Sequence, residues 1–380
     1  MKKRKILHVH SDYPDGREGY LPTKAVENLV DATESYSHFV ISINRTSNPF
    51  KYSISSFPRG LSVVYWSLPL PIIYRFSMWL LCIFLKIATR KTDYDLVHGH
   101  KLTTDGFVAR NLASNRSKPY FVSVRGGTDL NNIGRLPDMS GQYAKTFNLA
   151  SCVFWVSPWA KARVCSELAC SAKKEINLPN PCQLTIKGEP RAKEINRLVM
   201  ITSYAAYKRK GVIQVINAVS ELCRSGIDVS LDIFGGGEET VKAIIQNEIM
   251  RLGLESRVVL KGNVDNKSLL AVLPSYSLLV LPSINETFGM VYVEAAASMV
   301  PFIAHAGTGI DGHFDERFAV FVESQEPNVI AESIRCSLDN MDELLLSLRK
   351  YHQAGRFDQF TTQQIAKNYS DRIREALDGV

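Results

Sequence analysis

Two glutamates, Glu286 and Glu294, stand eight positions apart in a segment that resembles a strand, a loop and a helix start. The apolar run 278–281 before them has strand length and ends at a proline, and alanines follow Glu294. Ligands of open α/β sheets bind at the carboxyl ends of the strands, where a starting helix offers free N–H groups to a phosphate. A carboxylate repels a neighbouring phosphate. It is therefore expected to point elsewhere and to accept hydrogen bonds from hydroxyl groups. The segment therefore predicts a ligand that carries both phosphate and sugar hydroxyls.

Cations and glycines at neighbouring strand ends suit the same ligand. A basic loop, 208–210, opens a predicted helix, and glycine-rich turns follow two predicted strands at 235–237 and 307–309. A diphosphate needs cations and free N–H groups together, which Lys210 and the helix start at Gly289 supply. The plain alternatives are a solvated surface lysine and an ordinary tight turn. Their joint placement along one predicted sheet edge favours a binding site.

The two carboxylates suit different hydroxyl pairs. Glu294 fits the two adjacent hydroxyls of a ribose, and Glu286 fits those of a hexose. Alternatively, Glu286 is a helix-start carboxylate that the helix dipole favours.

The elements that must position these residues alternate between strands and helices in both halves of the chain. This rhythm predicts an α/β fold with parallel sheets, and 380 residues suffice for two domains. A polar, proline-marked stretch at 180–195 predicts the linker. We expect one domain over 1–180 and a second over 195–355, followed by an amphipathic helix at about 360–380. Strands are expected at 5–10, 39–43, 95–100, 120–124, 152–157, 198–202, 229–234, 257–261, 278–281 and 301–304.

Composition indicates an ordinary globular protein of a reducing compartment. The chain is 45% hydrophobic and 22% charged, close to the soluble average. Its seven cysteines show no zinc or disulfide spacing. The apolar run after the basic N-terminus, 6–10, is too short for a signal peptide. We therefore expect a cytoplasmic location.

Charge is distributed unevenly along the chain. Residues 1–180 hold 24 Lys+Arg against 13 Asp+Glu, a balance of +11, and the remainder holds 21 against 25, a balance of −4. This pattern is typical either of a solvated basic surface or of a surface that faces an anionic membrane. A nucleic-acid partner is disfavoured, because the cations are not interleaved with aromatic residues.

The most apolar segment is 76–88, which is shorter than the ~20 residues that span a bilayer. We expect a buried core helix, with a monotopic membrane contact as the alternative because basic residues flank it. The sequence Asp93-Tyr94-Asp95 spells a metal-binding D-x-D. It precedes a strand, where doubly wound sheets bind no ligand, and it is discounted.

These motifs together resemble the GT-B glycosyltransferases of the family-four type, which are retaining enzymes that use nucleotide-activated sugars. The segment 283–294 is similar to their E-x7-E segment, and Lys210-Gly211 to their K-G pair. The glycine turn 234–238 and the strand 257–262 resemble the family's nucleotide-side elements. The stretches 95–100 and 124–129 match two strand ends of its first domain more loosely.

The resemblance implies two Rossmann-like parallel-sheet domains that face each other across a cleft, with the C-terminal helix crossing back to the first domain. It implies donor turnover at Glu286, Lys210, Arg209 and Arg125. Nucleotide and donor contacts are expected at Glu294, Phe288, Gly289, Met290, Val291, Gly235, Gly236, Lys261 and Gly262. Acceptor-side candidates are Gly16, Gly19, His100 and Asp129.

The chain departs from the family pattern in four places. Tyr204 stands where the family usually has an arginine, and Arg125-Gly126-Gly127-Thr128-Asp129 replaces a motif that begins with histidine. The glycine loop after the first strand is Gly16-Arg17-Glu18-Gly19, and the turn 298–301 lacks its common glycine.

From the resemblance we expect sugar transfer from a nucleoside-diphosphate sugar to a glycan or lipid-linked acceptor, in surface polysaccharide or lipopolysaccharide synthesis. Neither a metal nor a bound cofactor is expected. The enzyme would act in the cytoplasm, at the inner face of the membrane. The alternatives are a nucleotide-sugar-binding protein without turnover, or an epimerase or hydrolase of the same fold.

Overall fold

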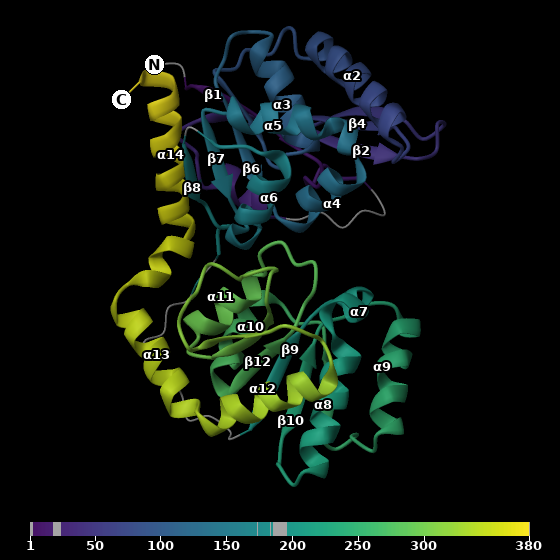
Figure 1. Cartoon of the computed structure of the whole chain (residues 1–380), viewed down its shortest axis with the longest axis vertical. Coiled ribbons are helices and arrows are strands. Elements are labelled where there is room, and N and C mark those ends of the chain that lie inside the picture. Colours follow the sequence, from purple (N-terminus) through teal and green to yellow (C-terminus); the bar gives the residue numbers. More distant parts are fainter. Residues whose placement is uncertain (1–2, 18–23, 173, 183, 185–195, 380) are drawn as a thin grey trace. The chain divides into compact units, whose positions relative to one another are not determined.

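A computed structural model describes residues 3–17, 24–172, 174–182, 184 and 196–379. The chain divides into two compact units (Figure 1). Unit 1 comprises Met1–Pro181 together with Thr362–Val380, and unit 2 comprises Cys182–Thr361. Most of the predicted linker, 180–195, lies outside the described residues, as does Gly19.

Unit 1 is built on an eight-stranded sheet with the order β3-β4-β2-β1-β5-β6-β7-β8. Neighbouring strands are parallel except for the β3–β4 hairpin. The strands are β1 (Lys5–His10), β2 (Ser37–Thr46), β3 (Ser53–Phe57), β4 (Gly60–Trp66), β5 (Leu96–Gly99), β6 (Tyr120–Val124), β7 (Cys152–Trp155) and β8 (Glu175–Asn177).

Helices cover both faces of this sheet, as a parallel sheet requires. On one face the C-terminal helix α14 (Thr362–Asp378) packs Ile365, Tyr369 and Ile373 against strand residues such as Ile6 and Phe121. The other helices of the unit are α1 (Ala25–Asp31), α2 (Pro71–Ala88), α3 (Thr104–Ser114), α4 (Gly127–Arg135), α5 (Ser140–Asn148) and α6 (Lys161–Leu168), with short 3-10 turns at Pro137–Met139 and Pro158–Ala160.

Helix α2 corrects one prediction. The segment was expected to be a buried core helix, yet only one face is buried, through residues such as Met78, Leu81 and Leu85. The other face leaves apolar side chains in solvent, including Ile72 and Trp79, which are 82% and 55% exposed. The segment is apolar on all sides, but α2 packs against unit 1 with one face only. The prediction of a buried helix therefore overestimated how much of the segment is buried. By length and composition α2 could cross a membrane, although its buried face belongs to the unit 1 core.

Unit 2 contains a six-stranded parallel sheet with the order β11-β10-β9-β12-β13-β14. Its strands are β9 (Arg197–Ile201), β10 (Ser230–Phe234), β11 (Val258–Gly262), β12 (Leu278–Leu281), β13 (Phe302–His305) and β14 (Ala319–Val322). Its helices are α7 (Tyr207–Lys210), α8 (Val212–Arg224), α9 (Glu239–Arg251), α10 (Asn266–Val272), α11 (Met290–Ala297), α12 (Pro327–Asp339) and α13 (Met341–Gln353), with 3-10 turns at Tyr204–Ala206, Leu273–Ser275 and Arg356–Phe360.

The predicted α/β class with two Rossmann-like parallel sheets is confirmed. The central strand β9 lies between β10 and β12, so the chain reverses direction across the sheet at this point. Doubly wound sheets bind ligands at such a switch point, outside the carboxyl ends of the strands. A ligand is therefore expected at the loops that follow β9, β10, β12 and β13.

Candidate active site

Glu286 lies at the carboxyl edge of the unit 2 sheet and is surrounded by donors. Its carboxylate forms ion pairs with Lys210 and Arg209, the latter at 3.2 Å, and accepts from the Ser283 hydroxyl at 3.2 Å. The sequence placed these residues at separate strand ends, after β9 and after β12. The structure brings them into one cluster.

The backbone on both sides of this cluster is also fixed. Thr308, after β13, accepts from the Glu286 N–H at 2.7 Å and donates to the Glu286 carbonyl at 3.0 Å. The Ile284 N–H donates to the Arg209 carbonyl at 3.0 Å, and the Gln325 side chain donates to the same carbonyl at 3.1 Å. Ser283 and Thr308 lie in the stretches 283–294 and 307–309 that the sequence analysis singles out, but neither was named as a site residue, and Gln325 was not predicted at all. They follow strand ends, which is the signal that could have found them.

The two glutamates have opposite electrostatic settings. Burial alone would raise the pKa of Glu286, but Lys210 and then Arg209 outweigh it, so the pKa lies below its usual value. For Glu294 burial dominates and raises the pKa, with a hydrogen bond from Asn266 opposing it. Glu286 is therefore held ionised among cations, whereas Glu294 lies in an apolar setting without a cation partner among the described residues.

Helix α11 begins directly beside Glu286. Gly289 caps the helix with φ +77°, a left-handed conformation that favours glycine. Among the described residues, the backbone N–H groups of Gly289, Met290 and Val291 have no protein acceptor, as expected for a helix N-terminus. The Phe288 side chain is buried against His313 and Phe360, so only its backbone faces this end.

A hollow of about 470 Å³ lies at the carboxyl ends of β9, β10 and β11. Gly235 and Gly236 line it as predicted, and the Gly235 N–H donates to the Gly262 carbonyl at 2.9 Å. A Cβ atom on Gly235 would meet the Thr202 carbonyl at 1.7 Å, so no other residue fits there. The hollow's remaining lining includes Thr202, Ser203, Asn263, Val264 and Leu269, which sequence reasoning missed.

Two side chains lie differently from their sequence-based expectations. Lys261 is 3.7 Å from Asp232, in the middle of β10, and does not line the hollow. Side chains alternate between the two faces of a strand, and Lys261 lies within β11. Its side chain therefore lies on a face of the sheet, whereas the loop after β11 lines the hollow. Tyr204 occupies the family's arginine position and is buried, and its hydroxyl has no hydrogen-bond partner within the described ranges.

In unit 1, three predicted residues meet at the carboxyl edge of β5 and β6. The Arg125 Nε donates to the His100 carbonyl at 2.8 Å, and Nη1 donates to Asn180 at 3.3 Å. Burial lowers the pKa of the Arg125 guanidinium. Asp129 accepts from the Arg125 N–H at 2.8 Å and from the N–H and hydroxyl of Thr103 at 3.0 and 3.1 Å. Both Asp129 oxygens are thus engaged by protein, and this carboxylate holds two loops together.

The loop after β1 is described only as far as Arg17. Gly16 has φ +84°. The preceding Asp15 accepts from Arg17 at 2.8 Å and from Ser62 at 2.7 Å. The predicted acceptor-side residue Gly19 lies outside the described residues.

Residues 186–354 match the family model of glycosyl transferases group 1. They form a domain of this family. The predicted resemblance to GT-B glycosyltransferases is thereby confirmed, and the matched range contains Glu286, Lys210, Arg209 and the glycine hollow.

A curated relative, an uncharacterized glycosyltransferase of Methanocaldococcus jannaschii, is 25% identical over 237 residues. The match covers 57% of this chain and 59% of that protein, less than two thirds of its length. The HepE protein of Anabaena, solved in complex with UDP, superposes with a TM-score of 0.67 at 16% identity, over 98% of this chain and 100% of that one. The lipopolysaccharide outer core galactosyltransferase WaaB gives a TM-score of 0.70 at 15% identity, over 98% and 100% of the chains. These two likenesses show that the glycosyl transferases group 1 domain belongs to a chain with the GT-B fold.

Proposed function

We propose that this protein is a retaining, metal-independent glycosyltransferase that moves a sugar from a nucleoside-diphosphate sugar to a glycan or lipid-linked acceptor. The observation that carries the proposal is the Glu286 carboxylate fixed between Lys210 and Arg209, beside the open N-terminus of α11. Membership of residues 186–354 in the glycosyl transferases group 1 family supports it.

The donor would bind along the carboxyl edge of the unit 2 sheet. The Lys210 ammonium has three donors and can therefore contact a phosphate while it keeps Glu286. The N–H groups of Gly289 to Val291 add uncharged donors for the same anion. Glu294 would accept from ribose hydroxyls, and the glycine hollow would take the nucleoside. UDP in the HepE complex makes uridine diphosphate the first donor nucleotide to test.

In the transfer step the bond between the sugar C1 and the diphosphate oxygen breaks, and its electron pair stays on the diphosphate. Lys210, Arg209 and the α11 N–H groups stabilise the charge that develops there. The acceptor hydroxyl forms the new C1–O bond on the face that the diphosphate leaves, and its proton passes to the diphosphate. Glu286 orients the donor sugar through its hydroxyls.

A lipid-linked acceptor is supported by the apolar surface of unit 1. The exposed face of α2 and the β3–β4 hairpin enclose a groove of about 330 Å³, lined by apolar side chains such as Tyr52, Ile54, Trp66, Phe76, Leu80 and Phe84. Basic residues near the ends of α2 suit anionic headgroups. We propose on this basis that the enzyme acts in the cytoplasm, at the inner face of the membrane, in surface polysaccharide synthesis.

A thermal-shift screen of the full chain against nucleoside diphosphates and their sugars tests the proposal. Stabilisation by one base and turnover of its sugar support it. Stabilisation without turnover would favour a nucleotide-sugar-binding protein, and conversion of the sugar without any acceptor would favour an epimerase or hydrolase. Both outcomes contradict the transferase.

A further inference from the structure

Unit 1 buries a group of histidines on the sheet face that α14 covers. Alternate positions of β1 run Ile6, His8, His10, and those of the neighbouring β5 run Leu96, His98, then His100 after the strand end. On this face, apolar side chains at the start of the two strands are therefore followed by histidines toward the carboxyl ends. His8, His10, His98 and His100 are at most 1% exposed. Buried polar groups need hydrogen-bond partners, so their bonds define how each ring is protonated.

Two of these rings, His8 and His100, form a chain with His38 of β2, and the chain starts at a backbone carbonyl. The Thr33 carbonyl accepts from His38 Nε2 at 3.0 Å, which places a proton on that nitrogen. His38 Nδ1 is then an acceptor for His8 Nε2, at 2.9 Å. His8 Nδ1 in turn accepts from His100 Nε2, at 2.9 Å. A carbonyl cannot donate, so the direction of every bond in the chain is fixed while the rings are neutral.

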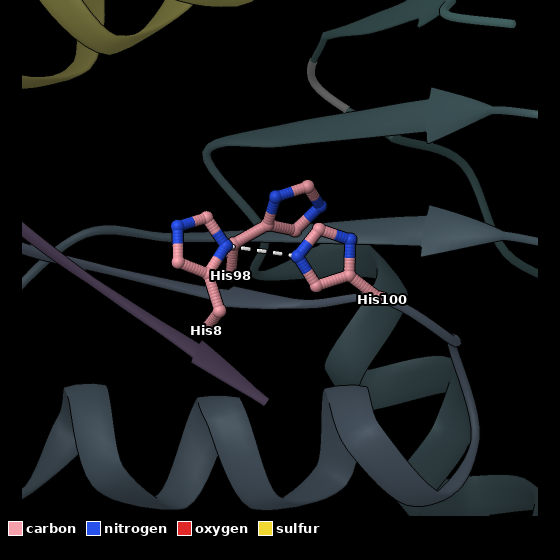
Figure 2. Close-up of side chains that lie close together, drawn as sticks. All are labelled: His8, His98 and His100. Carbon is pink, nitrogen blue, oxygen red and sulfur yellow. Dashed lines mark hydrogen bonds between the residues drawn. The ribbon is translucent and has the colours of Figure 1, made fainter. Parts of the chain in front are cut away.

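Burial keeps the rings neutral. It lowers the pKa of His38, His8 and His100, and neighbouring histidines lower it further for His8 and His100. The last ring of the chain, His100, consequently carries its proton on Nε2 and a lone pair on Nδ1. Figure 2 shows that this second nitrogen of His100 lies on the side of the ring that faces away from His8. It has no partner among the described residues.

The tautomer of a second imidazole at the same sheet edge, His10, is also fixed by its hydrogen bond. His10 Nδ1 lies 3.5 Å from the buried Asp105 carboxylate, which can only accept, so the proton lies on Nδ1. Asp105 is itself held by the Ser11 hydroxyl at 2.7 Å. His10 Nε2 is buried and has no hydrogen-bond partner in the part of the chain that the structure describes. The His10 and His100 rings are 5.6 Å apart between centroids, in an edge-on arrangement.

We propose that His100 Nδ1 and His10 Nε2 accept hydrogen bonds from hydroxyl groups of a polyol acceptor substrate, and that His38 and His8 are positioning residues that hold His100 in the required tautomer. This inference rests on the proposed transferase function and names the chemistry of its acceptor. Two neutral lone pairs at one sheet edge suit O–H donors and repel phosphate oxygens. The acceptor thus presents hydroxyls at this edge.

A metal ion is the competing use of His8, His98 and His100, whose nitrogens lie within 4.8 Å of one another. Both nitrogens of His8 are engaged by His100 and His38. Both nitrogens of His98 are engaged as well, by Tyr369 and Ser123 at 2.9 Å. A metal would have to break these bonds, whereas the neutral chain satisfies them.

The test uses the full chain with 15N-labelled histidine and saturating UDP, followed by NMR of the ring nitrogens. We expect His100 to be protonated on Nε2. Methyl glucoside, methyl galactoside and methyl mannoside serve as polyol probes, and we expect at least one to shift the His100 Nδ1 and His10 Nε2 signals. Protonation of His100 on Nδ1, absence of any shift, or capture of added Zn²⁺ by the three rings would overturn the proposal.

Variants separate positioning from folding. His38→Leu removes the chain's anchor and should raise the KM for the glycoside acceptor about tenfold, the cost of one hydrogen bond, with the donor KM unchanged. His38→Gln keeps a donor for Thr33 and an acceptor for His8, and should restore both tautomer and KM. Tyr369→Phe removes an equally buried hydrogen bond, to His98 and outside the chain, and should lower only stability.

Equal acceptor KM in His38→Leu and wild type, with normal donor binding, would overturn this inference alone. Absence of UDP binding and of donor turnover would overturn the transferase proposal and the acceptor role with it.

Discussion

The Thr308 hydroxyl and the Glu286 backbone exchange two hydrogen bonds, one in each direction, at 2.7 and 3.0 Å. A third bond, from the Gly309 N–H to the Glu286 carbonyl at 2.9 Å, reinforces the contact. The loop after β13 thus fixes the loop after β12, and with it the carboxylate that pairs with Lys210 and Arg209. The clamp therefore helps to fix the position of Glu286 together with its ion pairs.

Replacing Thr308 with valine tests the clamp. The variant keeps the shape but leaves the Glu286 N–H without its acceptor, which costs about 1–3 kcal/mol. We expect the free energy of unfolding, measured by urea titration, to fall by that amount and donor turnover to fall about tenfold, since Glu286 is less well fixed. Thr308→Ser keeps the hydroxyl and is the matched control. Equal turnover in both variants would show that the clamp does not position Glu286.

Replacing Gly235 with alanine tests the hollow. The added Cβ would overlap the Thr202 carbonyl, so the β10 end must move and UDP binding should be lost. Gly226→Ala is the control, because Gly226 also has positive φ, +81°, but open space around its Cβ. Its cost should be about 1–2 kcal/mol, the backbone strain alone. Isothermal titration with UDP that gave the same affinity for both variants would contradict the assignment of the hollow.

The buried histidines predict a pH dependence of stability. Burial holds the pKa of His8, His98 and His100 well below 6.5, so the unfolded chain binds more protons than the folded chain at mildly acidic pH. Stability is therefore complete above about pH 6.5 and falls as pH drops below it, by up to about 1.4 kcal/mol per pH unit and ring. Urea unfolding between pH 7.5 and 5.5 measures this slope. A flat profile would mean that these rings are not held neutral.

The carboxyl group of Glu286 affects stability in a lower pH range than the histidines begin to. Its pKa is depressed by Lys210 and Arg209, so its contribution is present above the unfolded value near 4.5 and is lost as pH falls further. The loss of stability from the histidines therefore begins at a higher pH than the loss from Glu286.

The exposed face of α2 predicts binding to anionic membranes. Replacing Phe76 and Trp79 with serine removes two stacked aromatic side chains that are 58% and 55% exposed. Flotation with vesicles of anionic phospholipid should lose most of the bound protein, without loss of folding. Leu149→Ser, at a residue 53% exposed on another part of unit 1, should leave binding intact. Equal flotation of both variants, or no preference for anionic over neutral vesicles, would remove the support for a membrane-bound acceptor.

The unit 2 site was largely predictable from the sequence, because its residues follow apolar strands directly. A parallel sheet collects its strand ends at one edge, so Glu286, Lys210 and Gly235 were expected together before any coordinates. Side-chain direction was not predictable in the same way. Lys261 lies within β11 and reaches Asp232 in the middle of β10, whereas Asn263 and Val264 after the strand line the hollow.

Unit 1 was less predictable for a different reason. The roles of His8, His38 and His100 depend on hydrogen bonds between β1, β2 and β5, which no local pattern encodes. The β3–β4 hairpin was likewise not foreseen, since its serine-rich first strand lacks apolar alternation. The apolar richness of α2 was visible in the sequence, but only packing shows which face remains exposed.

The central claim is that Glu286 serves donor turnover. Glu286→Gln keeps the size of the side chain but removes the charge that Lys210 and Arg209 hold, and Glu255→Gln, at an exposed position, is the matched control. With the nucleotide sugar that the thermal-shift screen identifies, we expect transfer by Glu286→Gln to fall at least about a hundredfold, with UDP binding retained and Glu255→Gln unchanged. Transfer by Glu286→Gln at the wild-type rate would contradict the account.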